Sequence, residues 1–126
     1  MQKITTAKAD IMLLDKNIVK MIIHNGVYLE KEDILEIYKI KCRLIKENYH
    51  VVLHICGTDT NMCREAQEVM ANGDLARNEL AKAIVTNSLA QKIAGIFFTK
   101  LDKSPKPIRL FESEDEALKW LKEFAI

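Results

Sequence analysis

The sequence lacks a long hydrophobic run and has almost no excess of charge of either sign. Its longest unbroken apolar stretches, such as residues 94–98, are far shorter than the roughly 20 residues that a membrane-spanning helix needs. Its net charge is +1, without the strong basic excess that is typical of nucleic-acid-binding proteins. We therefore expect neither a membrane span nor a nucleic-acid partner.

Cysteine and glycine are also scarce. The three cysteines (Cys42, Cys56 and Cys63) are odd in number and form no CxxC pair, which argues against a disulfide-stapled secreted domain and against a zinc ribbon. The N-terminus has no apolar signal core, so the cytoplasm is the expected location. The four glycines are not clustered, and no P-loop, GxGxxG, HExxH, GxSxG or EF-hand pattern occurs. These absences favour a protein that is not an enzyme and has no cofactor or metal.

What is present fits an ordinary globular chain. Apolar residues make up 48% of the 126 residues and charged residues 29%. A chain of this length can bury a sizeable core without staples, and it is too short for two comfortable domains. No repeat, low-complexity segment or linker interrupts it, so we expect a single domain over residues 1–126.

Local patterns predict an N-terminal hairpin and a long helix after it. Residues 11–14 and 18–23 are short apolar runs, and Asp15-Lys16-Asn17 between them is typical of a tight turn. From about Glu30 to about Asn48 apolar residues recur at helical spacing and predict an amphipathic helix. Its two adjoining stripes are Leu35, Tyr38, Cys42 and Ile45, and Ile34, Ile37, Ile40 and Leu44.

Strands and helices then alternate. Apolar, β-branched runs predict strands at 50–56, 82–86 and 108–111, with a partly helical connector over 74–80 and a proline-containing loop over 102–107. Capping residues predict helices from the region 58–61 to Asn72-Gly73, from Ser88 to about Leu101, and after Ser113. The order β-β-α-β-α-β-α-β-α predicts an α/β fold: a mixed sheet with an N-terminal antiparallel hairpin and parallel strands covered by helices.

Three stretches carry a family resemblance over residues 9–124. They are VVLHICG (51–57), SLAQKIAGIFFTKLDKSPKPIRLF (88–111) and SEDEALKWLKEF (113–124). With this element order, the chain resembles the STAS domain of bacterial anti-sigma-factor antagonists, and more closely the small stand-alone bacterial proteins called STAS/SEC14-like or SpoIIAA-like. That resemblance implies a STAS-like fold and a non-enzymatic, regulatory role through protein–protein interaction. For other members it implies nucleotide or lipid binding.

The usual phosphorylation motif of the STAS antagonists is missing. In those proteins a partner kinase phosphorylates a serine, typically within Asp-Ser-Ser-Gly, near the start of the helix after the central strand. This chain has Thr58-Asp59-Thr60-Asn61-Met62-Cys63 in that region, and His54 stands where an aspartate is common. The switch therefore does not transfer residue by residue, and Thr60 is the nearest hydroxyl.

Polar residues follow two neighbouring strands of the predicted sheet. Ligands of open α/β sheets bind outside the carboxyl ends of the strands, and helix N-termini attract anions. The binding or switch candidates are Thr58, Asp59, Thr60 and Asn61 after the first of these strands, and Asn87 and Ser88 after the second. Together they would form a small anion or ligand crevice, although plain helix capping explains each set as well.

Two arrangements that include a thiol fit either a reactive role or a purely structural one. His54 and Cys56 share one face of a strand and would make a nucleophile dyad or metal ligands, but a thiol in a buried strand is usually an inert small hydrophobe. Cys63 in the first helical turn would have a lowered pKa, yet no resolving cysteine is evident. We expect structural roles for all three.

The predicted third helix is the most apolar element. Leu89, Ile93, Ile96 and Phe97 form one stripe, and Ala90, Ala94 and Phe98 widen it. Phe97 and Phe98 point about 100° apart, so one faces the sheet and the other borders an apolar groove or extra core. A basic cluster at Lys92, Lys100, Lys103, Lys106 and Arg109, with Asp102 as the single acid, is expected to be a solvated rim.

Two functions remain open from the sequence, beside a poorly supported third, an enzyme that uses His54 and Cys56 or Cys63. One is a regulatory interaction module that binds a protein partner. The alternative is a carrier or sensor of a small apolar or anionic ligand, such as a lipid, in the manner of SEC14-like domains. An exposed hairpin edge at 11–14 or 18–23 would also allow a homodimer.

Overall fold

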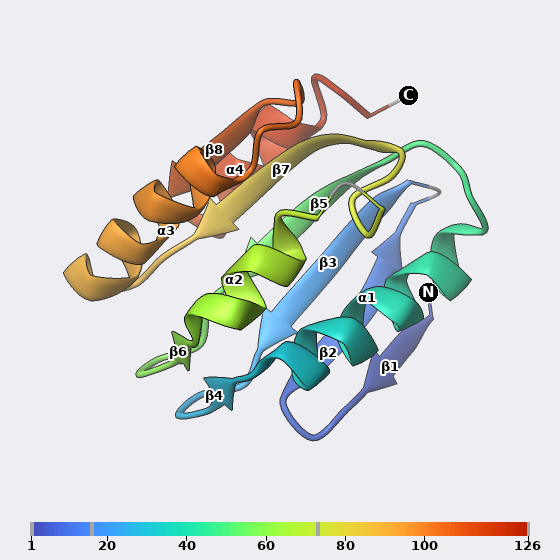
Figure 1. The fold of residues 1–126 in the computed structure, drawn as a ribbon. Coiled ribbons are helices and arrows are strands. Elements are labelled where there is room, and N and C mark those ends of the chain that lie inside the picture. Colours follow the sequence, from blue (N-terminus) through green and yellow to red (C-terminus); the bar gives the residue numbers. More distant parts are fainter. Residues whose placement is uncertain (1, 16, 73, 126) are drawn as a thin grey trace.

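A six-stranded mixed sheet forms the centre of the computed structural model (Figure 1). The structure describes residues 2–15, 17–72 and 74–125; Lys16 and Gly73, expected in a turn and at a helix end, lie outside the described residues. In spatial order the strands are β1 (Lys3–Thr5), β2 (Ala9–Leu14), β3 (Ile18–Ile23), β5 (His50–Ile55), β7 (Glu79–Val85) and β8 (Ile108–Phe111).

The predicted hairpin is present, and the strands after it are parallel. β2 and β3 pair antiparallel, with Leu14 opposite Ile18, whereas β3, β5, β7 and β8 pair parallel in turn. The unpredicted strand β1 pairs with β2 and covers its outer edge. Because β3 also lies inside the sheet, the exposed hairpin edge on which the dimer expectation rested does not exist. That argument for a homodimer was wrong.

Four helices cover the sheet: α1 (Lys31–Ile45), α2 (Arg64–Met70), α3 (Leu89–Leu101) and α4 (Glu114–Leu121). Figure 1 shows α1, α2 and α3 on one face and α4 on the other. Two buried clusters match these layers, a larger one that includes Tyr38 and Phe98 and a smaller one that includes Leu53 and Leu121. Within the described residues no helix is long and apolar enough to cross a bilayer.

The segment after β5 differs from the sequence prediction. The helix begins at Arg64 with Cys63 as its N-cap, so residues 58–61 do not cap it and Met62 is not helical. Instead β6 (Asn61–Met62) pairs in parallel with β4 (Tyr28–Leu29). The backbone pairing of β6 with β4, a segment distant in the sequence, takes the place of the helix cap that the local sequence predicts. A tertiary interaction thus overrides a local preference. The connector at 74–78 likewise forms turns rather than helix.

Gly57 fixes the position of this segment against β3. A Cβ atom at this position would collide with the carbonyl oxygen of Ile23 and would lie 2.7 Å from the carbonyl oxygen of His24. Both obstacles are backbone atoms, which cannot turn aside as a side chain can. Glycine is therefore required where the chain leaves β5 and enters the region of the candidate site.

Candidate functional site

The two predicted polar sets lie next to one another at the carboxyl ends of β5 and β7. The Asn87 side chain donates a hydrogen bond to the Cys56 carbonyl at 2.9 Å. The Gln91 amide donates to the carbonyl of Gly57 at 2.7 Å and to the Thr60 hydroxyl at 3.2 Å, and its oxygen accepts from the Asn87 N–H at 2.9 Å. Gln91 of α3 thus joins the two loops.

The individual candidates have different surroundings. Thr60 is half-buried, and its hydroxyl donates to the Gly57 carbonyl at 3.0 Å. Thr58 and Asp59 are exposed; Asp59 has a positive φ of 56°, which aspartate tolerates. Ser88 is the α3 N-cap and accepts from the N–H of Gln91 at 3.2 Å, as predicted. Because α2 begins only at Arg64, its N-terminal N–H groups are not adjacent to Thr60 in the chain.

Replacing Gln91 by leucine is expected to lower the free energy of unfolding by about 1–3 kcal/mol, because the Asn87 N–H and the Gly57 carbonyl lose a partner in a partly buried site. Urea unfolding followed by circular dichroism measures the loss. Gln67→Leu is the matched control: this half-buried glutamine has no side-chain hydrogen bond among the described residues, so its replacement should cost about 0.5 kcal/mol or less. Equal losses in the two variants would show that the hydrogen bonds are unimportant.

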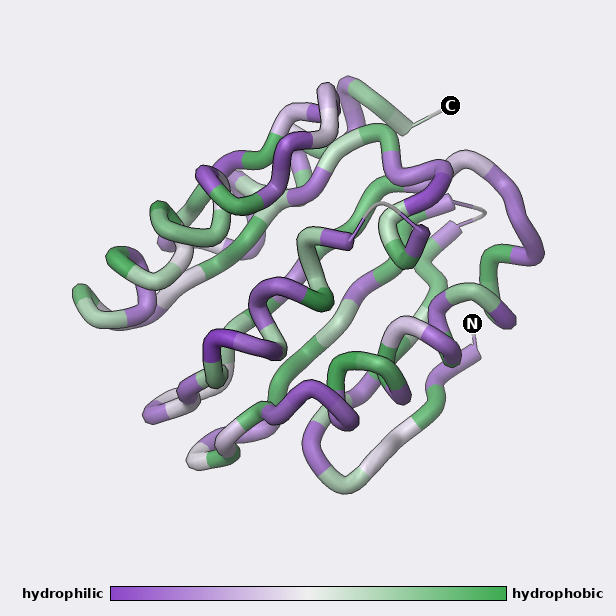
Figure 2. Tube along the Cα trace, viewed as in Figure 1, coloured by the Kyte–Doolittle hydropathy of each residue, from purple (hydrophilic) through white to green (hydrophobic). Residues whose placement is uncertain are grey.

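The large apolar residues of α3 face solvent. Leu89, Ile93, Ile96 and Phe97 are 74%, 60%, 44% and 50% exposed. We call these four residues the outer stripe; Figure 2 shows the hydrophobic character of α3. Phe97 and Phe98 do point apart, as expected, since Phe98 is buried. The reading of the stripe as extra core was wrong.

A glycine on the opposite face of α3 explains this orientation. The buried positions of α3 are Gln91, Gly95 and Phe98. A Cβ on Gly95 would lie 2.8 Å from Leu110 Cδ2, so the helix packs closely on β8 through a residue without a side chain. Phe98 is the one large apolar side chain of α3 that is buried, Leu101 is half-buried, and the outer stripe is left on the surface.

The basic cluster is divided between surface and interior. Lys92, Lys100 and Lys103 are exposed on α3 or just after it. Lys106 instead pairs with Asp102 at 3.1 Å and approaches Glu79 at 3.4 Å, within the fold. The expected solvated rim is therefore correct for three of the lysines and wrong for Lys106.

A pocket of about 110 Å³ lies between α2, α3 and the sheet. Its interior includes His54, Met70, Ile84 and Phe98, which are buried. Thr60, Asn61 and Gln91 contribute polar groups from the candidate loops and α3. The inner face of α3 therefore lines a pocket, while its outer face carries the exposed stripe.

His54 of β5 and Cys56, which follows that strand, also border this pocket. Burial raises the pKa of the Cys56 thiol to about 11, and burial together with the charge of Lys82 lowers the pKa of His54 to about 4. At neutral pH the thiol is protonated and the imidazole is uncharged, so neither is activated as a nucleophile pair. Among residues 2–15, 17–72 and 74–125, no group of three or more His, Cys, Asp and Glu could hold a metal ion.

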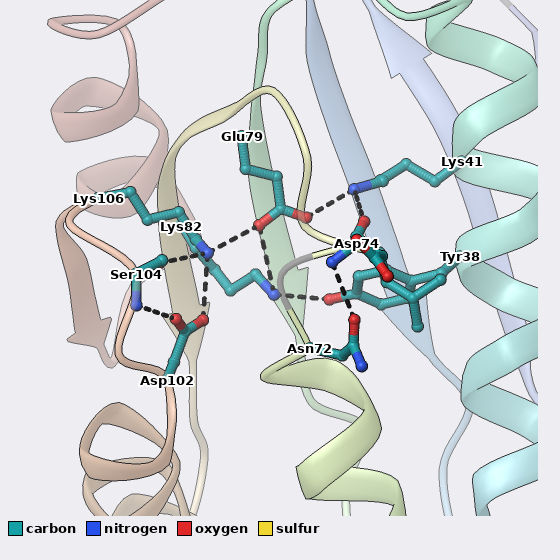
Figure 3. Close-up of polar contacts among 10 residues, drawn as sticks. Tyr38, Lys41, Asn72, Asp74, Glu79, Lys82, Asp102, Ser104 and Lys106 are labelled. Carbon is teal, nitrogen blue, oxygen red and sulfur yellow. Dashed lines mark hydrogen bonds and ion pairs between the residues drawn. The ribbon is translucent and has the colours of Figure 1, made fainter.

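Sequence reasoning missed a buried ionic network at the other end of the sheet (Figure 3). Lys41 of α1 donates to Glu79 at 2.6 Å, and Glu79 is also 3.6 Å from Lys82 and 3.4 Å from Lys106. The side chains of Lys41, Glu79 and Lys82 are fully buried. With Asp102, the network contains three lysines and two carboxylates.

Burial and charge oppose one another at Glu79. Burial alone would raise the pKa of its carboxyl, but Lys82, Lys41 and Lys106 together lower it to about 2. Lys82 also donates to the Tyr38 hydroxyl at 2.6 Å, and burial and Glu79 hold the pKa of that phenol well above its ordinary value. The network ties α1, β7 and the loop after α3 together.

One feature of the sequence does reveal part of this network. Ile34, Tyr38, Lys41 and Ile45 lie at helical spacing, so Lys41 falls within an otherwise apolar stripe that becomes the buried face of α1. Lys82 likewise stands in the buried strand β7, between Ala81 and Ala83. A lysine at a position that the pattern assigns to the core predicts a buried ion pair.

Comparisons with known proteins support the fold and assign no activity. The family model described as Domain of unknown function (DUF7793) matches residues 12–125. A search of curated proteins gave no significant match. The chain is similar to the crystal structure of an uncharacterized protein from the DUF3478 family, with a SpoIIAA-like fold, from Shewanella loihica PV-4. That similarity has a TM-score of 0.63 and 17% identity and covers 90% of this chain and 91% of the other. The expected SpoIIAA-like, STAS-like fold is confirmed.

Proposed function

Because the chain belongs to the family described as Domain of unknown function (DUF7793) and has a SpoIIAA-like fold, we propose that it is a non-enzymatic module that binds a protein partner through the outer stripe of α3. The observation that carries the proposal is the exposure of Leu89, Ile93, Ile96 and Phe97 on one helix face. A contiguous set of large exposed apolar side chains is characteristic of an interaction surface. The neutral His54 and Cys56 agree with a non-enzymatic role.

The charges around the stripe favour an acidic partner. α3 contains Lys92 and Lys100 and no acidic residue, and exposed Lys103 follows it. A partner helix with apolar residues on one face and Asp or Glu beside them would complement this surface in both respects. A symmetric dimer through α3 would instead bring the lysines of two copies together.

Ile93→Glu is expected to weaken partner binding at least tenfold, because it places a charge in the middle of the apolar contact. Tagged protein purified from cells of the source organism, with quantitative mass spectrometry, identifies the partner; titration with that purified partner then gives the dissociation constant. Tyr49→Glu is the matched control, since Tyr49 is 62% exposed and lies outside α3.

The Ile93→Glu and Tyr49→Glu variants distinguish specific partner binding from nonspecific hydrophobic association. The proposal requires a partner with an acidic segment that Tyr49→Glu retains and Ile93→Glu loses, with binding that weakens as salt increases. A partner retained by a folded Ile93→Glu variant would overturn the proposal. Circular dichroism checks that both variants are folded.

The pocket supports a second candidate function, that of a carrier or sensor of a small apolar ligand. Its interior is lined by buried apolar side chains of the sheet, α2 and α3. Apolar pockets with a few polar groups are the usual form of small-molecule sites. The lining contains no lysine, arginine, aspartate or glutamate, which favours the apolar over the anionic form of this candidate.

A further inference from the structure

The pocket between α2 and α3 limits the charge of any occupant. None of its lining residues is a lysine, arginine, aspartate or glutamate, and His54, whose pKa is about 4, is neutral at pH 7. An ionised group in such a site would lose its hydration without gaining a counter-ion, which is strongly unfavourable. The occupant is therefore uncharged.

The volume of the pocket limits the size of the occupant. Sites for drug-sized ligands usually have about 300–1,000 Å³, whereas this pocket has about 110 Å³. Its volume is of the same order as that of the roughly 150 Å³ apolar cavity known to take up benzene in another protein. The pocket therefore has room for one six-membered ring or a comparably short chain, and a full lipid acyl chain is too large for it.

The ring of His54 supplies one polar group. His54 lines the pocket and is 4% exposed, and within the described residues neither ring nitrogen has a hydrogen-bond partner. Its Nδ1 is completely buried whereas Nε2 is not, so Nε2 is the nitrogen that a ligand in the pocket can reach. A neutral imidazole offers one donor and one acceptor. Within the described residues Nε2 has no partner, so a ligand that hydrogen-bonds it gains an advantage over one that does not.

We infer that the pocket between α2 and α3 binds a small neutral molecule about the size of a single ring that carries one hydroxyl-type group, with His54 as the hydrogen-bonding partner of that group. The inference rests on the second candidate function, the carrier or sensor of a small apolar ligand. It narrows that candidate to one class of ligand. It does not involve the outer stripe, which lies on the opposite face of α3.

Phenol and benzene are matched probes for this site, because they differ by a single hydroxyl. Titration of the full-length, ¹⁵N-labelled protein at pH 7 is expected to show phenol binding roughly 3- to 10-fold more tightly than benzene. Amide resonances of Ala94 and Gly95, which line the pocket, should shift with both ligands. The imidazole ¹⁵N resonances of His54 should shift with phenol much more than with benzene.

Two variants test the assignment of His54. His54→Phe should retain benzene binding and lose the preference for phenol, whereas Ile93→Ala on the outer stripe should change neither. Retained benzene binding shows that the pocket of His54→Phe is intact. If that variant does not fold, the imidazole ¹⁵N shifts of the wild-type protein decide the question on their own.

The outcomes separate this inference from the function on which it rests. Equal affinities for phenol and benzene, or a phenol preference that persists in His54→Phe, would overturn the role of His54 and leave the carrier function standing. Tighter binding of decanol or of benzoate would overturn the size or the neutrality of the ligand in the same way. If neither probe nor decanol binds, both the inference and the carrier function fail.

Discussion

Glu79→Gln is expected to lower the free energy of unfolding by about 3–5 kcal/mol, which is a large share of the total stability of a domain of this size. The substitution keeps the shape of the side chain and removes its charge. Lys41 then loses its 2.6 Å ion pair and Lys82 loses its nearby carboxylate, whereas Lys106 keeps Asp102 at 3.1 Å. The loss of stability is the free-energy cost of leaving the buried ammonium groups of Lys41 and Lys82 without a carboxylate.

Urea unfolding of four variants tests this explanation: Glu79→Gln, Lys82→Met, the double variant of the two, and Glu68→Gln. Glu68→Gln is the control: its ion pair with Arg64 is exposed and 3.9 Å long, so its loss should cost about 0.5 kcal/mol or less. Adding Lys82→Met to Glu79→Gln should recover at least about 1 kcal/mol, because it removes one of the unpaired charges. If the double variant is as unstable as the sum of the single variants, charge imbalance is not the cause.

Acidification from pH 7 to about pH 4 is expected to remove about 6 kcal/mol of stability, about 3 kcal/mol for each of two buried histidines. Burial, with a contribution from Lys41, lowers the pKa of His50 to about 4; burial and Lys82 do the same for His54. Below pH 6.5 the unfolded chain binds a proton at each histidine while the folded protein does not. Stability therefore falls as the pH decreases from about 6.5 to 4.

Glu79 extends the acid sensitivity to lower pH. Its pKa is about 2 in the folded protein against 4.5 as the ordinary value, so its stabilising contribution is present above pH 4.5 and is lost as the pH falls towards 2. Urea unfolding at intervals between pH 7.5 and pH 4.5 isolates the histidines from most of this contribution. His54→Phe should show about half of the wild-type decrease in that range. An unchanged decrease would contradict the assignment to His54.

Local patterns were sufficient for most of the fold. Apolar runs and caps located the hairpin, the long first helix, the strands β5, β7 and β8, and the helix that begins after Ser88. Strand β1 was missed because its three residues are exposed and carry no apolar alternation. The short pair β4 and β6 was missed because each strand depends on the other, 33 residues away in the chain, and neither has a signal of its own.

The candidate site was predicted only in part. The sequence indicated that Thr60 and Asn87 lie at neighbouring strand ends, and the structure places both sets together through Gln91. It did not indicate which face of α3 turns inward, because large apolar side chains occur on more than one face of that helix. The close packing of Gly95 against Leu110 decides the orientation, and it involves residues of different elements.

The most direct test of the outer stripe as a binding surface is photo-crosslinking from Ile93. A photoreactive amino acid at this position, with the same residue at Tyr49 as the control, is introduced into the protein in cells of the source organism. We expect one protein to be crosslinked from position 93, through a segment rich in acidic residues, and not from position 49. No crosslink from position 93, or the same set of proteins from both positions, would contradict the proposal that this protein binds its partner through α3.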